Sequence, residues 1–250
     1  QNLTLFRILW NIWNGIITPR ILCKHGVLGA TLMLAQTIEK RPKEKLTKIM
    51  SKRNMTEDEI IDILHSGDLS ELWKNGVDLN FRIESSENDT LLLYAIGEVE
   101  DDDCYLELIE RGADCSARND CGENLLISAI FSQSLERVKK VLSIAPDQID
   151  QTDNYGATAL FWSIILKQFD IAEYLIEAGA DVMIADNENS APLHVASFVG
   201  NVDLVKRLIT AGADPNRSTS KGNIPLAIAI QQNHKEVAEY LFPIWVEDPT

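Results

Sequence analysis

The side chains best suited to metal binding or nucleophilic catalysis are four histidines and four cysteines, and they lie far apart along the chain. The histidines are His25, His65, His194 and His234, and the cysteines are Cys23, Cys104, Cys115 and Cys121. Zinc sites usually draw their ligands from close pairs such as CxxC, and the sequence contains no such pair. It also lacks the phosphate-binding loops GxGxxG and GxxxxGK[ST] and the catalytic motifs HExxH and GxSxG. We therefore expect no metal, no cofactor and no enzymatic activity.

Carboxylates are the other groups that could do chemistry, as general acids and bases, and the chain has 38 Asp and Glu residues. Their densest run is Glu98–Cys104, with the sequence EVEDDDC. Charge runs usually face water, so the first interpretation is a solvated loop. The alternative is an electrostatic finger that attracts a basic partner and raises the association rate. The sequence predicts no paired catalytic carboxylates.

The net charge of −15 at pH 7 disfavours nucleic acid as a partner, because nucleic-acid-binding proteins usually carry a basic face. A protein with a basic surface is the more natural partner. The charge is unevenly spread, since residues 1–49 hold eight Lys or Arg and two Asp or Glu, whereas residues 50–250 hold 15 and 36. The cysteine spacing shows no disulfide framework, which indicates reduced thiols and a cytoplasmic location.

Residues 1–49 form an apolar, basic segment that differs in character from everything after it. Arg7, Arg20 and Lys24 interrupt its apolar runs and Pro19 breaks any single helix, so a membrane-spanning helix is not predicted. We interpret the segment as a short, packed helical region. The alternative is a helix formed by residues 1–38 that lies on a membrane surface. The sequence leaves open whether this segment is native to the functional protein.

The elements that would position any site follow from an internal repeat. Matching leucines recur at spacings of 34, 34, 33 and 33 residues, and they are Leu92, Leu126, Leu160, Leu193 and Leu226. The triplet GAD follows 19 residues after two of these leucines, at Gly179 and Gly212, and 20 residues after the first, at Gly112. The register slips by one in that first unit, inside the acidic run. The second unit has Ala145 where glycine is expected and keeps its length.

Each landmark has a structural meaning. Pro192 and Pro225 suit the first position of a helix, where the missing amide costs no hydrogen bond. The glycine of GAD suits a helix C-terminus, where a left-handed backbone conformation favours glycine. Between them, segments such as VDLVKRLI place apolar residues along one helical stripe. Each unit therefore predicts a short helix, a turn, a longer helix and an extended loop, and neighbouring units must stack to bury their apolar faces.

The period and motifs such as PLHVA resemble those of the ankyrin-repeat family, over Met55 to Phe242. The resemblance implies an all-α ankyrin-repeat solenoid, made of stacked helix-turn-helix units with extended loops and preceded by a short helical N-terminal segment. The implied domains are that segment at 1–49, an N-terminal half-repeat cap at 50–84, and five repeats with a C-terminal tail at 85–250. His194 falls at the histidine of the family's TPLH motif, where we expect a structural hydrogen bond.

The resemblance also implies a non-catalytic interaction module that binds another protein through its concave face. By position, the partner-binding residues of the inner helices are Glu98, Phe131, Ile165, Leu166, Phe198, Val199 and Gln231. Those of the loop tips are Glu87, Asp89, Asp120, Glu123, Asn154, Tyr155, Asn187 and Glu188. The apolar members predict an exposed patch, and the alternative is that they fill gaps between repeats. Two other functions stay open: an acidic inhibitor of a basic enzyme, of the immunity or antitoxin type, and a membrane-associated adaptor anchored by residues 1–38.

Overall fold

The computed structural model describes residues 55–246, so the predictions made for residues 1–49 lie outside it. The half-repeat at the start of the described region contains α3 (Glu57–Ser66) and α4 (Ser70–Asn75). The five helix pairs that follow are α5 (Leu91–Glu98) with α6 (Asp102–Glu110), α7 (Leu125–Phe131) with α8 (Leu135–Ile144), α9 (Ala159–Ile165) with α10 (Phe169–Glu177), α11 (Pro192–Val199) with α12 (Val202–Thr210), and α13 (Pro225–Gln231) with α14 (Lys235–Val246).

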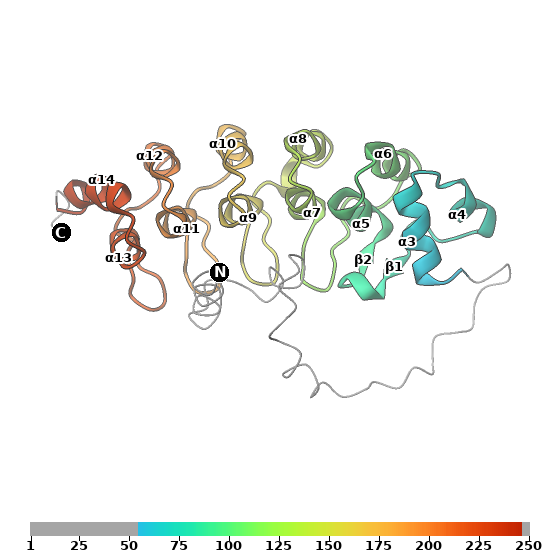
Figure 1. Cartoon of the computed structure of the whole chain (residues 1–250), viewed down its shortest axis with the longest axis horizontal. Helices are drawn as coiled ribbons and strands as arrows, with labels where there is room; N and C mark the ends of the chain where they lie inside the picture. The colour runs from blue at the N-terminus through green and yellow to red at the C-terminus, as the bar shows by residue number, and fades with distance from the viewer. Residues whose placement is uncertain (1–54, 247–250) are drawn as a thin grey trace, which may run out of the picture. The chain divides into compact units, whose positions relative to one another are not determined.

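The two helices of each pair belong to two rows of the array (Figure 1). The first helices, α5, α7, α9, α11 and α13, form the inner row, and the second helices, α6, α8, α10, α12 and α14, form the outer row. Each inner helix packs against its own outer helix and against the neighbouring inner helices. The predicted solenoid is confirmed, with one small addition: β1 (Arg82–Ile83) and β2 (Asp89–Thr90) form a short antiparallel pair in the first loop.

The repeated leucines are the centre of the core. All five, Leu92, Leu126, Leu160, Leu193 and Leu226, are buried. Burying a leucine side chain contributes about 1.5–3 kcal/mol, so this one position accounts for a large part of the stability of the stack. At the start of the inner helices α5, α7 and α9, the side chains of Thr90, Asn124 and Thr158 accept a hydrogen bond from the amide three residues later. Pro192 and Pro225 begin α11 and α13, as predicted.

The glycines of GAD end the outer helices as predicted. Gly112, Gly179 and Gly212 have φ angles of 90°, 95° and 99°, in the left-handed region that favours glycine. The second full repeat, which has Ala145 instead, ends with the short 3-10 helix η3 (Pro146–Gln148). The buried Gln148 side chain then ties two repeats together, because its Nε2 donates to the carbonyl of Cys115 at 2.7 Å and its Oε1 accepts from the amide of Leu126 at 3.1 Å.

The one-residue slip in the first full repeat changes its inter-helix turn. In the four later repeats this turn contains a residue with positive φ, which is Gln133, Lys167, Gly200 or Asn233. The first turn, Val99–Asp101, contains no such residue, and α5 is one residue longer than α7. The acidic run therefore has a backbone path of its own. Among the helices at residues 55–246, none is long and apolar enough to cross a membrane.

Candidate partner-binding face

The loop tips of neighbouring repeats are joined by backbone hydrogen bonds. The amides of Asp120, Asn154, Asn187 and Ser220 donate to the carbonyls of Glu87, Cys121, Tyr155 and Glu188, over 2.8, 2.9, 2.8 and 2.8 Å. Side chains add a second set of bonds, as when Asn187 Nδ2 donates to the carbonyl of Asn154 at 2.9 Å. The tips therefore form a regular ladder, which fixes the spacing of any side chains that point away from it.

Buried aspartates hold the individual loops in shape. Asp153 Oδ1 accepts from the amides of Tyr155 and Ala157, both at 2.9 Å, and its Oδ2 accepts from the indole of the buried Trp162 at 2.8 Å. Asp186 receives the amides of Glu188 and Ser190 in the same way. Burial raises the pKa of Asp186, although those two amide hydrogen bonds act in the opposite direction. These carboxylates are used inside the loops.

The loop-tip residues chosen from the sequence divide into two groups. Glu87, Asp120, Asn154, Asn187 and Glu188 are exposed, and Tyr155 is half-buried. Asp89 and Glu123 are 2% and 0% exposed, and both accept a hydrogen bond from Asn119 Nδ2, at 2.8 and 2.9 Å. Their carboxylates brace the first two loops from within and are removed from the candidate surface.

The apolar residues at the ends of the inner helices lie together. Phe131 and Ile165 are the last residues of α7 and α9, Leu166 follows α9, and Phe198 and Val199 end α11. All five are half-buried, and the ring of Phe131 lies 5.5 Å from that of Trp162 in the next repeat. We call these five residues the inner-helix patch. The two polar positions at either end of this series, Glu98 and Gln231, are exposed.

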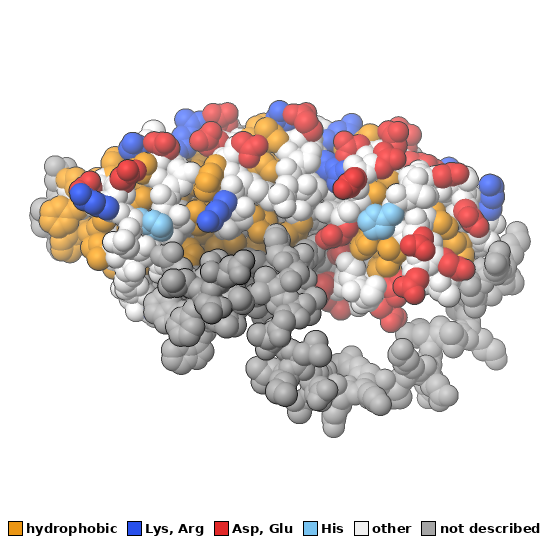
Figure 2. All heavy atoms as spheres, viewed as in Figure 1, with side chains coloured by type: hydrophobic (Ala, Val, Ile, Leu, Met, Phe, Trp, Pro, Cys, Tyr) orange, Lys and Arg blue, Asp and Glu red, His pale blue; other side chains and the backbone are white. Residues whose placement is uncertain are grey.

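The surface charge is distributed unevenly over the described repeats. Figure 2 shows acidic side chains crowded over α3 to α6, with hydrophobic side chains visible along the inner row farther along the array. The crowding includes the acidic run, in which Glu98, Glu100, Asp101, Asp102 and Asp103 are all exposed. One face of the array therefore offers carboxylates near its N-terminal end and apolar groups near its middle.

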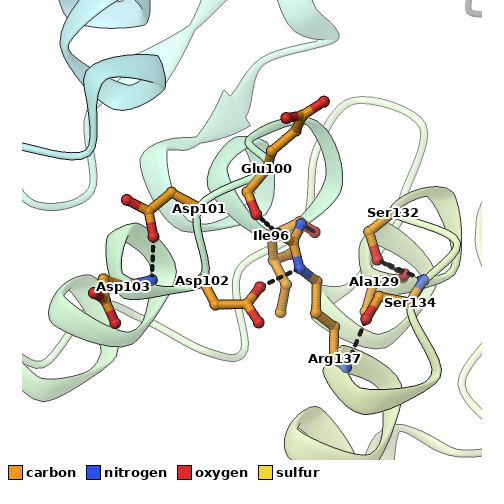
Figure 3. A network of polar contacts seen from close by, with 9 residues as sticks. All are labelled: Ile96, Glu100, Asp101, Asp102, Asp103, Ala129, Ser132, Ser134 and Arg137. Atoms are coloured by element: carbon orange, nitrogen blue, oxygen red, sulfur yellow. Dashed lines mark hydrogen bonds and ion pairs between the residues drawn. The ribbon is translucent and has the colours of Figure 1, made fainter.

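Part of the acidic run has a structural role that was not foreseen from the sequence. Arg137, on α8, is only 6% exposed, and its Nε forms an ion pair with Asp102 Oδ1 at 2.6 Å. Its two terminal nitrogens donate to the carbonyls of Ile96 at 3.0 Å and Glu100 at 2.7 Å. Figure 3 shows the guanidinium turned toward the end of α5 and the acidic turn. We call these bonds the Arg137 network. A signal was present, because Arg137 shares a helix face with Val141, four residues on, which is buried.

Comparison with known proteins decides the family. A family model for ankyrin repeats, described as three copies, matches residues 92–186 and 183–245, which is more than half of the chain. The chain belongs to the ankyrin-repeat family. Ankyrin repeats generally mediate protein–protein interaction, and the family is typically non-catalytic.

The curated relatives of this ankyrin-repeat chain match it over short segments. It is 31% identical over 90 residues to the nuclear factor NF-kappa-B p105 subunit of Gallus gallus, a match that covers 34% of this chain and 9% of that protein. It is 34% identical over 93 residues to diacylglycerol kinase zeta of Rattus norvegicus, covering 36% and 10%. It is 39% identical over 69 residues to the probable 26S proteasome regulatory subunit p28 of Saccharomyces cerevisiae, covering 27% and 30%. The chain thus spans less than a third of each of these relatives.

His194 has the structural role predicted for the TPLH position of an ankyrin repeat. Its Nδ1 accepts from the amide of Ala191 at 3.1 Å, which leaves Nε2 to donate to the carbonyl of Arg217 at 2.8 Å. The ring is buried, and desolvation lowers its pKa. The neutral imidazole therefore joins its own repeat to the following loop.

The cysteines of the described region are free. Cys104 is buried, while Cys115 and Cys121 are half-buried. Burial raises the pKa of the Cys104 thiol to about 12, which suppresses its reactivity as a thiolate. Within residues 55–246, no group of three or more His, Cys, Asp or Glu side chains is placed to hold a metal ion. Cys23 lies outside this range.

Proposed function

We propose that this protein is a non-catalytic ankyrin module that binds a partner protein through the inner-helix patch and the adjoining loop tips. The observation that carries the proposal is the position of the patch. Three successive inner helices, α7, α9 and α11, end in apolar side chains that remain half-buried in the finished fold. Contiguous exposed apolar groups on a soluble protein usually mark an interaction site.

The geometry of the patch supports a binding role. Its residues come from rigid helix ends, so a partner would meet side chains that lose little conformational freedom on binding. Phe131 already packs against Trp162, and a supported aromatic side chain is a common form of binding hot spot. The loop-tip ladder places Asn154, Tyr155 and Asn187 at fixed positions next to one another. Polar groups around an apolar centre are typical of protein interfaces.

The charge of the module favours a basic partner. The chain carries −15 at pH 7, and the exposed carboxylates gather at the N-terminal repeats. Complementary charge chiefly speeds association and selects among partners. We therefore propose that association with the partner slows when the salt concentration rises, because salt screens exposed charges.

The test is affinity capture with a matched pair of variants from one repeat. Ile165 ends the inner helix α9 and Ile176 lies on the outer helix α10, and both are half-buried. We expect Ile165→Ala to lose the proteins that the wild type captures, whereas Ile176→Ala retains them, once equal urea midpoints show that both variants are folded. Phe198→Ala should act like Ile165→Ala. Capture of the same proteins by all these variants would remove the inner-helix patch as the binding face.

A further inference from the structure

A groove opens between the inter-helix turns of the first two full repeats. Its volume is about 360 Å³, which lies within the range of about 300–1,000 Å³ common for ligand pockets. The residues that matter for its chemistry are Gly97, Glu98, Glu100, Asp102, Phe131 and Arg137. It therefore lies where the acidic turn meets the first member of the inner-helix patch.

The groove depends on Gly97. The equivalent residues of the next three repeats are Phe131, Ile165 and Phe198, all large and apolar. At Gly97, a side-chain Cβ would lie 3.2 Å from the carbonyl oxygen of Ser128, so glycine lets α5 approach α7 closely. No side chain from this position fills the space beside Phe131, and the ring is left as an apolar wall. The groove is thus a place where the regular inner-helix contact has been omitted.

The charges at the groove favour a cation. Glu98, Glu100 and Asp102 carry three carboxylates, against the single guanidinium of Arg137. That guanidinium is committed to the fold, because its nitrogens bond to Asp102 and to the carbonyls of Ile96 and Glu100 (Figure 3). The side chains of Glu98 and Glu100 are exposed at the opening. The groove therefore combines an acidic rim, an apolar wall and a surplus of negative charge.

We propose that this groove binds a lysine or arginine side chain of the partner protein, with the alkyl part against Phe131 and the cationic head among the carboxylates of Glu98 and Glu100. The inference rests on the proposed function and adds to it a position and a chemical class for one contact. An alkyl cation suits such a site, since long basic side chains cover apolar surface while their charged end stays near water and counter-charges. The partner would then place this basic residue on the N-terminal side of the residues that cover the inner-helix patch.

The experiment uses small cations in place of the unidentified partner. The full chain is titrated with n-butylguanidinium and with n-butylammonium, and backbone amide shifts are followed by NMR; n-butanol is the neutral control. We expect saturable shifts at Gly97, Val99 and Ser132, with a dissociation constant of about a millimolar for so few atoms. The two cations distinguish an arginine-type from a lysine-type preference. Butanol should give no saturable shift at these amides.

Matched variants decide whether the rim is responsible. The double change Glu98→Gln and Glu100→Gln removes two carboxylates and leaves intact the backbone carbonyl that Arg137 uses. We expect it to weaken cation binding at least fivefold. Glu173→Gln removes one exposed carboxylate from the outer helix α10 and should leave binding unchanged. Equal affinity of the wild type and the double variant, or no saturable shift in the wild type, would overturn the inference.

The outcome is separable from that of the proposed function. If Ile165→Ala abolishes partner capture but the groove binds neither cation, the module still binds a partner and the groove assignment falls. If the groove binds cations in the wild type but capture is insensitive to the inner-helix patch, the proposed face falls and the cation site remains.

Discussion

Replacing Arg137 by methionine should destabilise the first two repeats more than any other single change at the acidic turn. The substitution retains most of the side-chain volume and removes the guanidinium. Two backbone carbonyls, those of Ile96 and Glu100, then lose their donor at 3.0 and 2.7 Å, and Asp102 loses its ion-pair partner at 2.6 Å. The cation also lies 5.5 Å from the ring centroid of Tyr105, so that contact is lost as well.

The expected magnitude follows from how well each partner can be rehydrated. A hydrogen bond from a charged donor contributes about 1.5–3 kcal/mol, and an acceptor left without a partner in the interior costs a similar amount. The Ile96 carbonyl is in the buried part of the network, whereas the Asp102 side chain is 53% exposed and can turn to water. We expect Arg137→Met to lower the free energy of unfolding by about 3–4 kcal/mol. Asp102→Asn should cost about 1 kcal/mol, because it removes only the half-exposed ion pair.

Urea unfolding followed by circular dichroism at 222 nm measures both values, and the double variant closes a thermodynamic cycle for the pair. Lys139→Met is the control, since it makes the same substitution on the same helix at a side chain that is 41% exposed, and it should leave the midpoint unchanged. The reasoning is refuted if Asp102→Asn costs as much as Arg137→Met. A loss of less than 1 kcal/mol for Arg137→Met would also refute it.

Two further predictions concern the repeats nearer the C-terminus. Burial lowers the pKa of His194, so below its ordinary value of about 6.5 the unfolded chain takes up a proton that the native chain resists; stability is complete above that pH and falls as the pH drops toward the native pKa. The urea midpoint should therefore decrease between pH 7.5 and pH 5.5, and His194→Gln should flatten this dependence; an unchanged slope would contradict the assignment. Gly156 and Gly179 both have positive φ, 77° and 95°, but a Cβ on Gly156 would lie 2.9 Å from the amide nitrogen of Asn187, whereas one on Gly179 meets nothing within 4 Å. Gly179→Ala should cost about 1 kcal/mol, for the left-handed backbone alone, and Gly156→Ala about 3 kcal/mol or more by urea unfolding; equal costs would show that the loop tips are looser than the ladder implies.

The solenoid could be predicted from sequence because its determinants are local and recur in every unit. A leucine at every thirty-third or thirty-fourth residue fixed the centre of each inner helix, and Gly112, Gly179 and Gly212 fixed the ends of outer helices. Pro192 and Pro225 fixed two helix starts. Each of these signals acts through the backbone of its own repeat, so a one-dimensional pattern contains it.

The side-chain roles at the loops could not be predicted in the same way. Asp89 and Glu123 occupy tip positions in the family pattern, yet both are buried on Asn119. Whether a carboxylate points outward or inward depends on a donor in the same or the next loop, and its spacing from that donor varies. The contact from Asn119 to Asp89 spans 30 residues, and that to Glu123 spans four. A repeat pattern aligns positions and does not show which of them have found partners.

The acidic run shows how one short segment can serve both stability and recognition. Its inward groups, the Asp102 carboxylate and the Glu100 carbonyl, bind Arg137, while the carboxylates of Glu98 and Glu100 face outward. Because the same turn carries both sets, the Arg137 network holds the rim of the groove in place. In a solenoid each repeat contacts only its neighbours, so a change in this turn should act locally. Loss of Arg137 should therefore disturb the groove and the first two repeats while leaving Ile165 and Phe198 in position, whereas Glu100→Gln should alter the groove without loss of stability. The irregular first repeat is thus best understood as a rebuilt inter-repeat contact, in which the regular apolar side chain was replaced by a glycine, a buried arginine and an acidic rim.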